Sequence, residues 1–380
     1  MFKVVSAGAS AWLESLLDLA SPAASDPGVD AVVDACTTWL LAGQRYSRTA
    51  DGGVASHFSL KDGWASSYPE TTGYIVPTLL AVATTYDRLE CRDAAARMIA
   101  WLESIQFEDG SFQGGNVDAR PKAPVVFNTG QILFGLAAGV GAFGDAHREP
   151  MRRAADWLLA AQEADGAWRK ARSPFTTPGP KAYETHVAWA LLEAHAVDPG
   201  RGYAEAALAN IRWATTQQTE NGWFESCGLQ SNDAPITHTI AYTLRGILAG
   251  WQHSRDSALL DTARRTADAV GRLVRPDGWL AGAFDRRWDA AANWVCMTGS
   301  SQLAECFFIL HTVTGETRYR ELAQSLNRFV RARIRLDGPP GKLGGVKGSF
   351  PVFGDYGPFR YLNWAAKFTI DANLAELRQS

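Results

Sequence analysis

Six apolar segments recur along this chain and begin in similar ways. They are ETTGYIVPTLLAVA (70–83), FNTGQILFGLAAG (127–139), YETHVAWALLEAH (183–195), ITHTIAYTLRGILAG (236–250), CMTGSSQLAECFFIL (296–310) and LNWAAKFTIDANLAE (362–376). All but the last carry an early threonine, and these threonines stand 54 to 59 residues apart, at Thr72, Thr129, Thr185, Thr239 and Thr298. A hydroxyl there can accept a hydrogen bond from a free backbone N–H group, which predicts a helix beginning near each threonine.

More polar, amphipathic segments alternate with the apolar ones. They run near residues 28–44, 91–106, 148–162, 203–218, 257–274 and 317–335. Helices that are apolar on nearly every side are buried, whereas a single apolar stripe is typical of helices at a surface. This alternation predicts an all-α fold, an (α/α)6 toroid of six helical hairpins in two concentric rings. We expect residues 1–380 to form one such domain, with residues 1–27 as an N-terminal helical extension.

The connections that follow the outer helices also repeat. They are QFEDGSF (106–112), QEADGAW (162–168), QTENGWF (218–224) and RPDGWL (275–280). We expect each glycine to end its outer helix in the left-handed conformation. Trp168, Trp223 and Trp279 should then pack onto the ring. At these positions the chain resembles the Gln–Gly–Trp repeats of squalene cyclases and prenyltransferase-like toroids. That resemblance implies an architecture, because one fold can host many chemistries.

Charge and composition argue against several classes of protein. The net charge of −3 disfavours a nucleic-acid partner, and we find no run of about 18 apolar residues that would span a membrane. The first residues predict an amphipathic helix and not a signal peptide. Five cysteines at wide spacings, without a CxxC pair, favour a cytoplasmic protein without disulfides. Metal-ligand spacings and nucleotide-binding glycine motifs are missing, so we expect no metal and no cofactor.

The loops that enter the inner helices should emerge on one face of the ring. They are long, and long loops on a rigid scaffold often carry function. The N-termini of the inner helices converge there and favour anions. Polar residues near the first turns of these buried helices should face the resulting cavity. They are Tyr68, Glu70, Asn128, Gln131, Tyr183, Glu184, His186, His238, Tyr242, Gln302, Asn363 and Lys367.

Several of these residues fit known chemistries of sugar modification. Glycoside hydrolysis requires two carboxylates that face one cavity, and Glu70 and Glu184 are the best pair. Lyase or C5-epimerase chemistry on a uronic acid requires a group that removes a proton, and cations or amides that neutralise the sugar carboxylate. His186 and His238 occupy equivalent positions in neighbouring repeats. The predicted catalytic residues are Glu70, Tyr183, Glu184, His186, His238 and Tyr356.

The C-terminal connection, GGVKGSFPVFGDYGPFRYLNWAAKF (344–368), is rich in glycine and aromatic residues. It can cover the cavity, close the ring against the first hairpin, or do both. Lys347, Arg360 and Lys367 are expected to give the cavity a positive potential. The predicted substrate-binding residues are Tyr68, Asn128, Lys347, Asp355, Arg360, Tyr361, Asn363 and Lys367.

Four stretches carry a narrower resemblance. SYPETTGYIVPTLL (67–80), ITHTIAYTLRGIL (236–248), CMTGSSQLAE (296–305) and residues 344–368 are similar to uncharacterised toroid proteins of bacterial exopolysaccharide biosynthesis clusters. This resemblance implies a carbohydrate context and supplies no catalytic residues. We therefore expect an enzyme that modifies an anionic, uronic-acid-containing saccharide as a lyase, an epimerase or a hydrolase.

Two other functions remain open. The first is a terpenoid or prenyl cyclase, a class that resembles this architecture. Its usual DxDD acid is missing, so Glu70 or Asp355 would have to replace it. The second is a non-catalytic glycan-binding protein. Strongly perturbed pKa values in the cavity would favour an enzyme over a binding protein.

Overall fold

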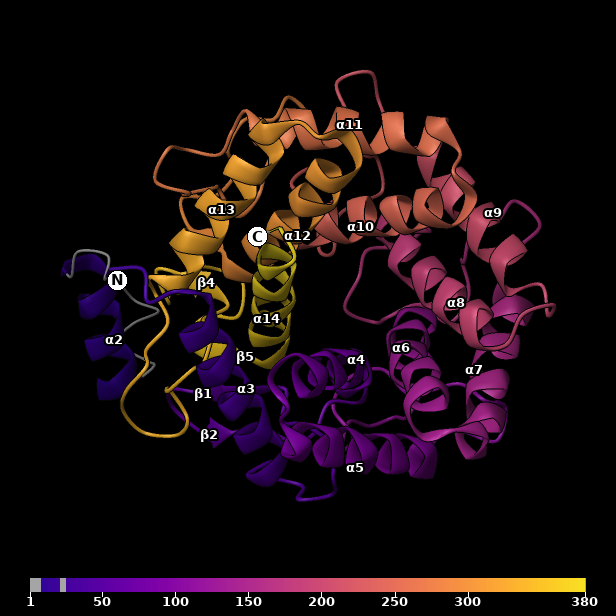
Figure 1. Cartoon of the computed structure of the whole chain (residues 1–380), viewed down its shortest axis with the longest axis horizontal. Helices are drawn as coiled ribbons and strands as arrows, with labels where there is room; N and C mark the ends of the chain where they lie inside the picture. Colours follow the sequence, from indigo (N-terminus) through magenta and orange to yellow (C-terminus); the bar gives the residue numbers. More distant parts are fainter. Residues whose placement is uncertain (1–7, 21–24, 380) are drawn as a thin grey trace.

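The structure is a computed structural model, and it describes residues 8–20 and 25–379. Within these residues, two concentric rings of six α-helices surround a central axis (Figure 1). The outer ring contains α3 (Val29–Arg45), α5 (Leu89–Ile105), α7 (Arg148–Ala161), α9 (Tyr203–Thr215), α11 (Ser257–Gly271) and α13 (Thr317–Arg331). The inner ring contains α4 (Pro69–Tyr86), α6 (Val126–Phe143), α8 (Thr185–Val197), α10 (Thr237–Ser254), α12 (Met297–Thr314) and α14 (Asn363–Leu377). The predicted (α/α)6 toroid is confirmed.

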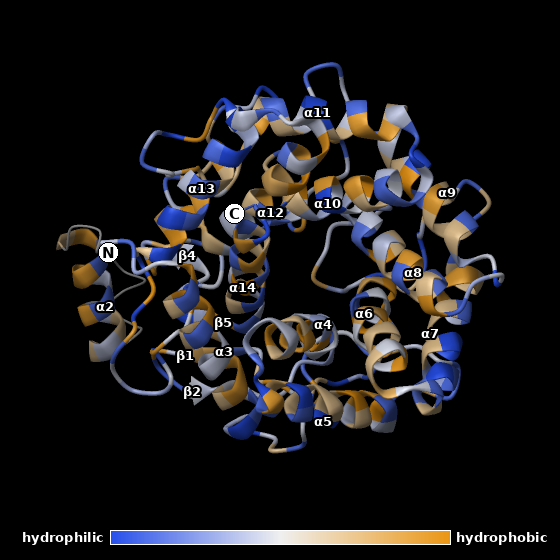
Figure 2. Ribbon diagram, in the orientation of Figure 1, coloured by the Kyte–Doolittle hydropathy of each residue, from blue (hydrophilic) through white to orange (hydrophobic). Residues whose placement is uncertain are grey.

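The inner helices pack tightly against one another, and hydrophilic residues gather on the outer ring (Figure 2). Glycines allow this close approach. A Cβ atom on Gly73 of α4 would overlap the backbone of Ile132 on α6, and one on Gly246 of α10 would overlap the backbone of Thr185 on α8. These neighbouring inner helices therefore lie closer together than any residue larger than glycine at these positions would allow.

Glutamines tie two of the turns that follow outer helices to the next outer helix. Nε2 of Gln106 donates to the carbonyl oxygens of Gly110 and Pro150, both at 2.9 Å, and Gln162 forms the equivalent pair of bonds. Gly110 has a φ of 92°, but it lies in the turn, whereas the C-cap of α5 is Gln106 in an extended conformation. The prediction that this glycine ends the outer helix is therefore wrong.

The tryptophans of these connections pack as predicted. Trp168 and Trp223 are fully buried in the core, and Trp279 packs against it. The glycine one or two residues before each of them lets the turn touch the backbone of the following outer helix.

The repeated threonines hold the connections in place. Oγ1 of Thr72 accepts a hydrogen bond from the backbone N–H of Val54, and Oγ1 of Thr129 accepts one from Phe112, both at 3.0 Å. These N–H groups belong to the preceding connection and not to the first turn of the helix. The predicted capping role is therefore wrong for these two residues, which instead anchor the loop to the inner ring.

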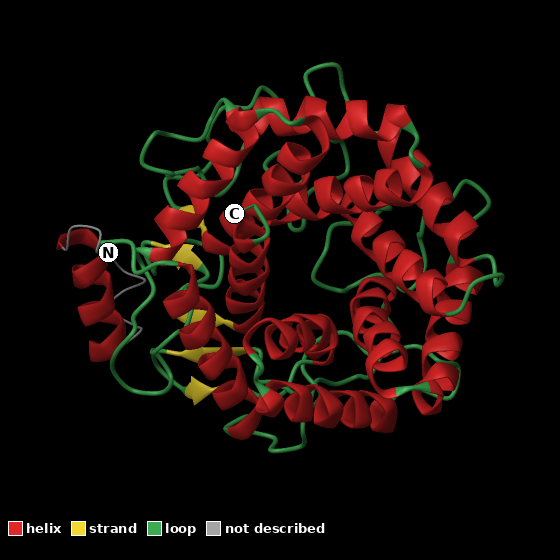
Figure 3. Ribbon diagram, in the orientation of Figure 1, coloured by secondary structure: helices red, strands yellow, loops and turns green. Residues whose placement is uncertain are grey.

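Two small sheets lie in the long connections (Figure 3). β1 (His57–Ser59) pairs with β2 (Gly63–Trp64) on one side and with β5 (Arg360–Leu362) on the other, both antiparallel. β3 (Val295–Cys296) pairs with β4 (Ser349–Phe350). Because α14 also packs against α3 and α4, the last hairpin closes the ring on the first.

α2 (Ala9–Ala20) packs on the C-terminal connection, outside the two rings. Its polar face turns inward, where Glu14 lies 2.8 Å from Nζ of Lys347. Trp12, Leu13 and Leu19 are exposed. Residues 1–7 and 21–24 of the expected N-terminal extension lie outside the described residues.

Among the described helices, α6 has the length and hydropathy of a membrane span. The expectation that no stretch is this apolar is therefore wrong. In the structure, 72% of this helix is buried within the protein, as is usual for a core helix.

Candidate functional site

A cavity of about 190 Å³ lies among the N-terminal ends of the inner helices, and we call it the upper chamber. It is lined by Tyr68, Glu70, Tyr74, Phe127, Asn128, Ser173, Phe175, Thr176, Tyr183, Leu229, His238, Thr239, Tyr242, Tyr356 and Trp364. The structure thus brings together seven residues that were predicted from the sequence. They are Tyr68, Glu70, Asn128, Tyr183, His238, Tyr242 and Tyr356.

Glu70 is the only carboxylate among the described residues that line the upper chamber. It is the second residue of α4, and its Oε2 accepts hydrogen bonds from Oη of Tyr68 at 2.8 Å and from Nδ2 of Asn128 at 2.9 Å. Burial raises the pKa of Glu70 to about 7, although the bond from Tyr68 opposes this shift. The carboxyl group can therefore gain and lose a proton near neutral pH, as general acid–base catalysis requires.

Tyr68 remains a hydrogen-bond donor to this carboxyl group. Burial and the neighbouring charge of Glu70 raise the pKa of Tyr68 well above its ordinary value. The phenol stays protonated at any pH at which the protein would work.

His238 is the second residue of α10 and is neutral. Its Nδ1 lies 2.6 Å from Oε1 of Gln302, which can only accept, so Nδ1 carries the hydrogen and Nε2 is left as an acceptor. Burial lowers the pKa of His238 to about 4. Its ring lies 5.6 Å from that of Tyr356, whose Oη accepts a hydrogen bond from Nε1 of Trp364 at 2.8 Å.

Glu184 is not among the residues that line the upper chamber. It ends η2 (Ala182–Glu184), the short 3-10 helix before α8, and its Oε2 accepts a hydrogen bond from the backbone N–H of Lys181 at 3.3 Å. Burial raises the pKa of Glu184 to about 8, but this carboxyl group does not line the upper chamber. The prediction that Glu70 and Glu184 face one cavity is therefore wrong.

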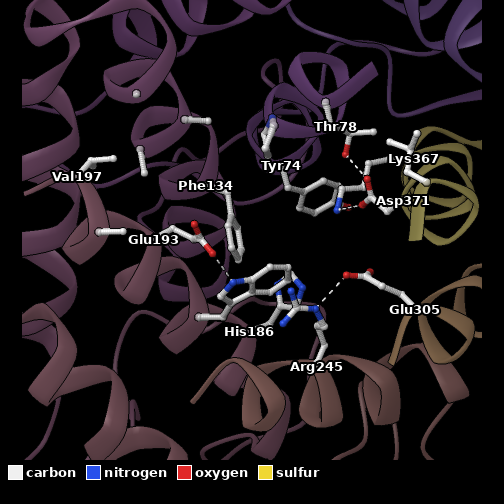
Figure 4. Close-up of a pocket in the computed structure, with 18 of the residues that line it drawn as sticks. Tyr74, Thr78, Phe134, His186, Glu193, Val197, Arg245, Glu305, Lys367 and Asp371 are labelled. Carbon is white, nitrogen blue, oxygen red and sulfur yellow. Dashed lines mark hydrogen bonds and ion pairs between the residues drawn. The ribbon is translucent and has the colours of Figure 1, made fainter. Parts of the chain in front are cut away.

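His186 lines a different cavity. This lower chamber, of about 330 Å³, lies among the middle and C-terminal turns of most inner helices and also takes in His186 (Figure 4). Tyr242 separates the two histidines, because its ring lies 4.2 Å from that of His186 and 4.3 Å from that of His238. The prediction that both histidines share one cavity is also wrong.

The predicted cations do not gather at the upper chamber. Lys347 is buried beneath α2, where its Nζ contacts Glu14 and Asp18. Lys367 pairs with Asp371 at 2.6 Å and lines the lower chamber. Arg360 is exposed, and it is not part of the upper chamber's lining.

The other predicted binding residues of the C-terminal connection lie elsewhere too. Asp355 is exposed and does not line the upper chamber. Tyr361 is buried, with Glu14 close enough to contribute to its raised pKa. Nδ2 of Asn363 donates to the carbonyl oxygen of Ala55 at 2.9 Å and to Oγ1 of Thr71 at 2.7 Å, which joins α14 to the first hairpin.

Sequence analysis missed much of the aromatic wall, including Tyr74, Phe127 and Trp364. A signal was present for Tyr74, which follows Glu70 by one helical turn, as Tyr242 follows His238. Residues four apart lie on the same face of a helix. Extending Glu70 and His238 by one turn gives Tyr74 and Tyr242, whereas the positions of Phe127 and Trp364 have no such signal.

Metal-ligating side chains are scattered in this fold. Among the residues that the structure describes, no group of three or more His, Cys, Asp or Glu could hold a metal ion. The five cysteines are buried and unpaired.

Comparison with known proteins places the chain among toroids. Residues 69–248 match the model of the squalene-hopene cyclase C-terminal domain. A probable squalene–hopene cyclase of Sinorhizobium fredii is 30% identical over 157 residues, which are 39% of this chain and 22% of the relative. The chain thus matches only about a fifth of that protein's length. The expected resemblance to the squalene-cyclase type of toroid is confirmed.

Two solved structures share the fold across nearly their whole length. An unsaturated glucuronyl hydrolase specific for heparin has a TM-score of 0.73 at 15% identity, covering 92% of this chain and 97% of that one. D-mannose isomerase also has a TM-score of 0.73, at 12% identity, covering 93% and 97%. At these identities the likeness concerns the fold alone.

Proposed function

We propose that this chain is a carbohydrate-active enzyme in which Glu70 transfers a proton to or from a sugar ring held in the upper chamber. The observation that carries the proposal is the environment of Glu70. Its carboxyl group is held by Tyr68 and Asn128, and burial raises its pKa to about 7. A group poised near the working pH is what proton transfer requires. Glu184 also has a raised pKa, but only Glu70 of these two carboxylates lines the chamber.

The wall of the chamber suits a sugar because it combines flat apolar faces with hydrogen-bonding groups. Phe127 and Trp364 offer aromatic faces, whereas Asn128, Thr239 and the hydroxyl groups of several tyrosines offer polar atoms. The volume of about 190 Å³ lies below the ~300 Å³ usual for pockets that hold larger ligands, and it suits one ring. The sugar substrates named for the two similar folds support this class of ligand.

Among sugar chemistries, we favour a lyase or a C5-epimerase acting on a uronic acid. Hydrolysis by two facing carboxylates has less support, because Glu70 alone among the described lining residues is a carboxylate. In a lyase, the Glu70 carboxylate takes the C5 proton while the C4–O bond breaks and a C4=C5 double bond forms. The departing oxygen then takes that proton from Glu70. In an epimerase, Glu70 takes the C5 proton, and a tyrosine hydroxyl of the chamber wall returns a proton to C5 on the opposite face.

The predicted cations lie away from the upper chamber. The preference for an anionic ring therefore rests on the N-termini of the inner helices, which surround the chamber and carry partial positive charge. Exopolysaccharide biosynthesis as the biological setting, and the cytoplasm as the location, remain predictions from the sequence.

Exchange of the C5 proton tests the proposal directly. In deuterated buffer, an epimerase should place deuterium at C5 of an oligoglucuronate or an oligomannuronate, whereas a lyase should release products with a C4=C5 double bond, and NMR follows both. Glu70→Gln should slow this exchange by roughly 10²-fold or more. Glu108→Gln, which changes an exposed carboxylate outside the chamber, is the matched control and should have no effect. Absence of exchange and of turnover with every uronate tested would refute the proposal.

A terpenoid cyclase is the second candidate, favoured by the aromatic wall and by the family match over residues 69–248. Aromatic faces stabilise carbocations, and Glu70 in its protonated form could protonate an alkene. Incubation with squalene and with geranylgeranyl diphosphate, followed by mass spectrometry of the products, distinguishes the two enzymes. Saccharide binding without any turnover would instead favour the glycan-binding alternative.

A further inference from the structure

The lower chamber is built by all six inner helices, one or more turns beyond the residues of the upper chamber (Figure 4). α4 contributes Thr78, α6 contributes Phe134, and α8 contributes both His186 and Trp189. The charged residues of its wall are Glu193, Arg245, Glu305, Lys367, Asp371 and Arg378. Such charges are unexpected on helices that otherwise form an apolar core.

Four of these charges form two ion pairs. Nε of Arg245 lies 3.0 Å from Glu305, and Nζ of Lys367 lies 2.6 Å from Asp371. These side chains are mostly buried, with 5% to 19% of their surface exposed. Apolar residues of similar size usually stabilise a fold at least as well as buried ion pairs do. Stability of the ring therefore does not account for them.

Two polar atoms beside these pairs have no hydrogen-bond partner. They are Nη1 of Arg245, a donor, and Nε2 of His186, an acceptor because Nδ1 faces Oε1 of Gln131 at 2.7 Å. Both groups contact Trp189: the guanidinium carbon lies 3.6 Å from its ring centroid, and the imidazole centroid lies 5.0 Å away. Buried polar groups without partners are unfavourable, and a ligand hydroxyl can both accept from an arginine and donate to an imidazole.

The charged side chains of this wall balance, with three carboxylates, Glu193, Glu305 and Asp371, and three cations, Arg245, Lys367 and Arg378, so the wall offers an anion no excess positive charge. The cations of Arg245 and Lys367 are already paired, and Glu193 adds a carboxylate that accepts from Nε1 of Trp189 at 2.6 Å. The C-termini of the inner helices also point toward this end and carry partial negative charge. The upper chamber lies at the opposite, N-terminal ends of the same helices, so the two ends differ in the ligand charge that they favour.

We propose that the lower chamber is a second binding site, for an uncharged polyhydroxylated ligand of one or two sugar rings. Its volume of about 330 Å³ accommodates such a molecule. The site does not depend on the proposed reaction, because Tyr74 is the only described residue that lines both chambers.

The test compares saccharide binding in two chamber-blocking variants by saturation-transfer NMR. The probes are D-mannose and cellobiose, which are neutral, and D-glucuronate. Ala81→Trp places a large side chain in the lower chamber from a partly exposed position, and Ser173→Trp does the same in the upper chamber. We expect Ser173→Trp to keep the binding of a neutral sugar and Ala81→Trp to weaken it by about tenfold or more.

A paired substitution then tests the polar wall. Arg245→Met with Glu305→Met removes both partners, so no uncompensated charge stays buried. The matched control is Arg264→Met with Glu316→Met, which removes an ion pair of 2.6 Å far from the chamber. The lower-chamber double variant should keep the melting temperature and lose about tenfold in affinity, whereas the control should bind normally.

Three results would overturn the proposal. They are the loss of neutral-sugar binding in Ser173→Trp but not in Ala81→Trp, the absence of binding of either neutral sugar to the wild type, and tighter binding of glucuronate than of neutral sugars in Ser173→Trp. Failure of the C5-exchange experiment would leave this test intact, because it measures binding at the other end of the ring.

Discussion

The buried carboxyl group of Glu70 should make the protein less stable as pH rises. An unfolded chain releases this proton near pH 4.5, whereas the folded protein holds it until about pH 7. Between these values the folded state binds more protons than the unfolded state, so the free energy of unfolding falls with rising pH. The difference between 4.5 and about 7 corresponds to about 3 kcal/mol, fully present below pH 4.5 and lost as pH passes 7.

Urea denaturation of the wild type and of Glu70→Gln at about pH 4.5 and about pH 8.5 measures this effect. The variant cannot ionise, so relative to the wild type it should gain about 3 kcal/mol between the two conditions. Glu184, whose pKa is also raised by burial, contributes equally to both proteins and cancels. If the two proteins lose stability in parallel, Glu70 is not held in a protonated form and the proposed acid–base role loses its basis.

Three further predictions concern other contacts of the structure. Tyr68→Phe removes a hydrogen bond that lowers the pKa of Glu70, so the pH profile of C5 exchange should move upward by about one unit; a downward shift would contradict this role. Gly73→Ala should lower stability by about 1–3 kcal/mol in thermal melts because its Cβ would overlap the backbone of Ile132, whereas Gly141→Ala has room and should not; equal melting temperatures would refute this packing. Glu14→Gln with Asp18→Asn leaves Lys347 buried without a partner and should lower the free energy of unfolding by about 3 kcal/mol in urea, so an unchanged value would show that α2 is not held by this contact.

The two rings were predictable because each inner helix is apolar on nearly every side, a pattern that is visible within a single segment. Glu70, Asn128 and His238 were placed correctly for the same reason. Each stands in the first turn of an inner helix, and the start of the apolar segment in the sequence shows where that turn is.

His186 shows where that reasoning failed. It is the second residue of α8, but η2 comes directly before this helix, so helical backbone begins at Ala182. His186 consequently stands about one turn deeper than His238 and reaches the other chamber, while Glu184 turns away from the upper one. A short 3-10 turn leaves no periodic pattern in a sequence.

The prediction that the cations gather at the cavity failed for a different reason. Lys347 belongs to the same C-terminal stretch, 344–368, as Arg360 and Lys367, but its partner Glu14 is more than 300 residues away. Nothing local to either segment indicates that α2 turns its carboxylates toward the protein. Pairing between distant segments depends on how the ring closes, which the hydrophobic pattern does not determine.

That closure has a consequence for the order of events during synthesis. Tyr68 comes from the first hairpin and Trp364 from the last, yet their ring centroids are 6.2 Å apart in the wall of the upper chamber. While the ribosome is still making the chain, the earlier helices can form only an open arc, and the flank of α4 that later meets α14 has nothing to cover it. Such exposed apolar surface favours aggregation of nascent chains. The upper chamber is therefore completed only as α14 emerges from the ribosome, so a nascent chain should lack the complete chamber wall until then.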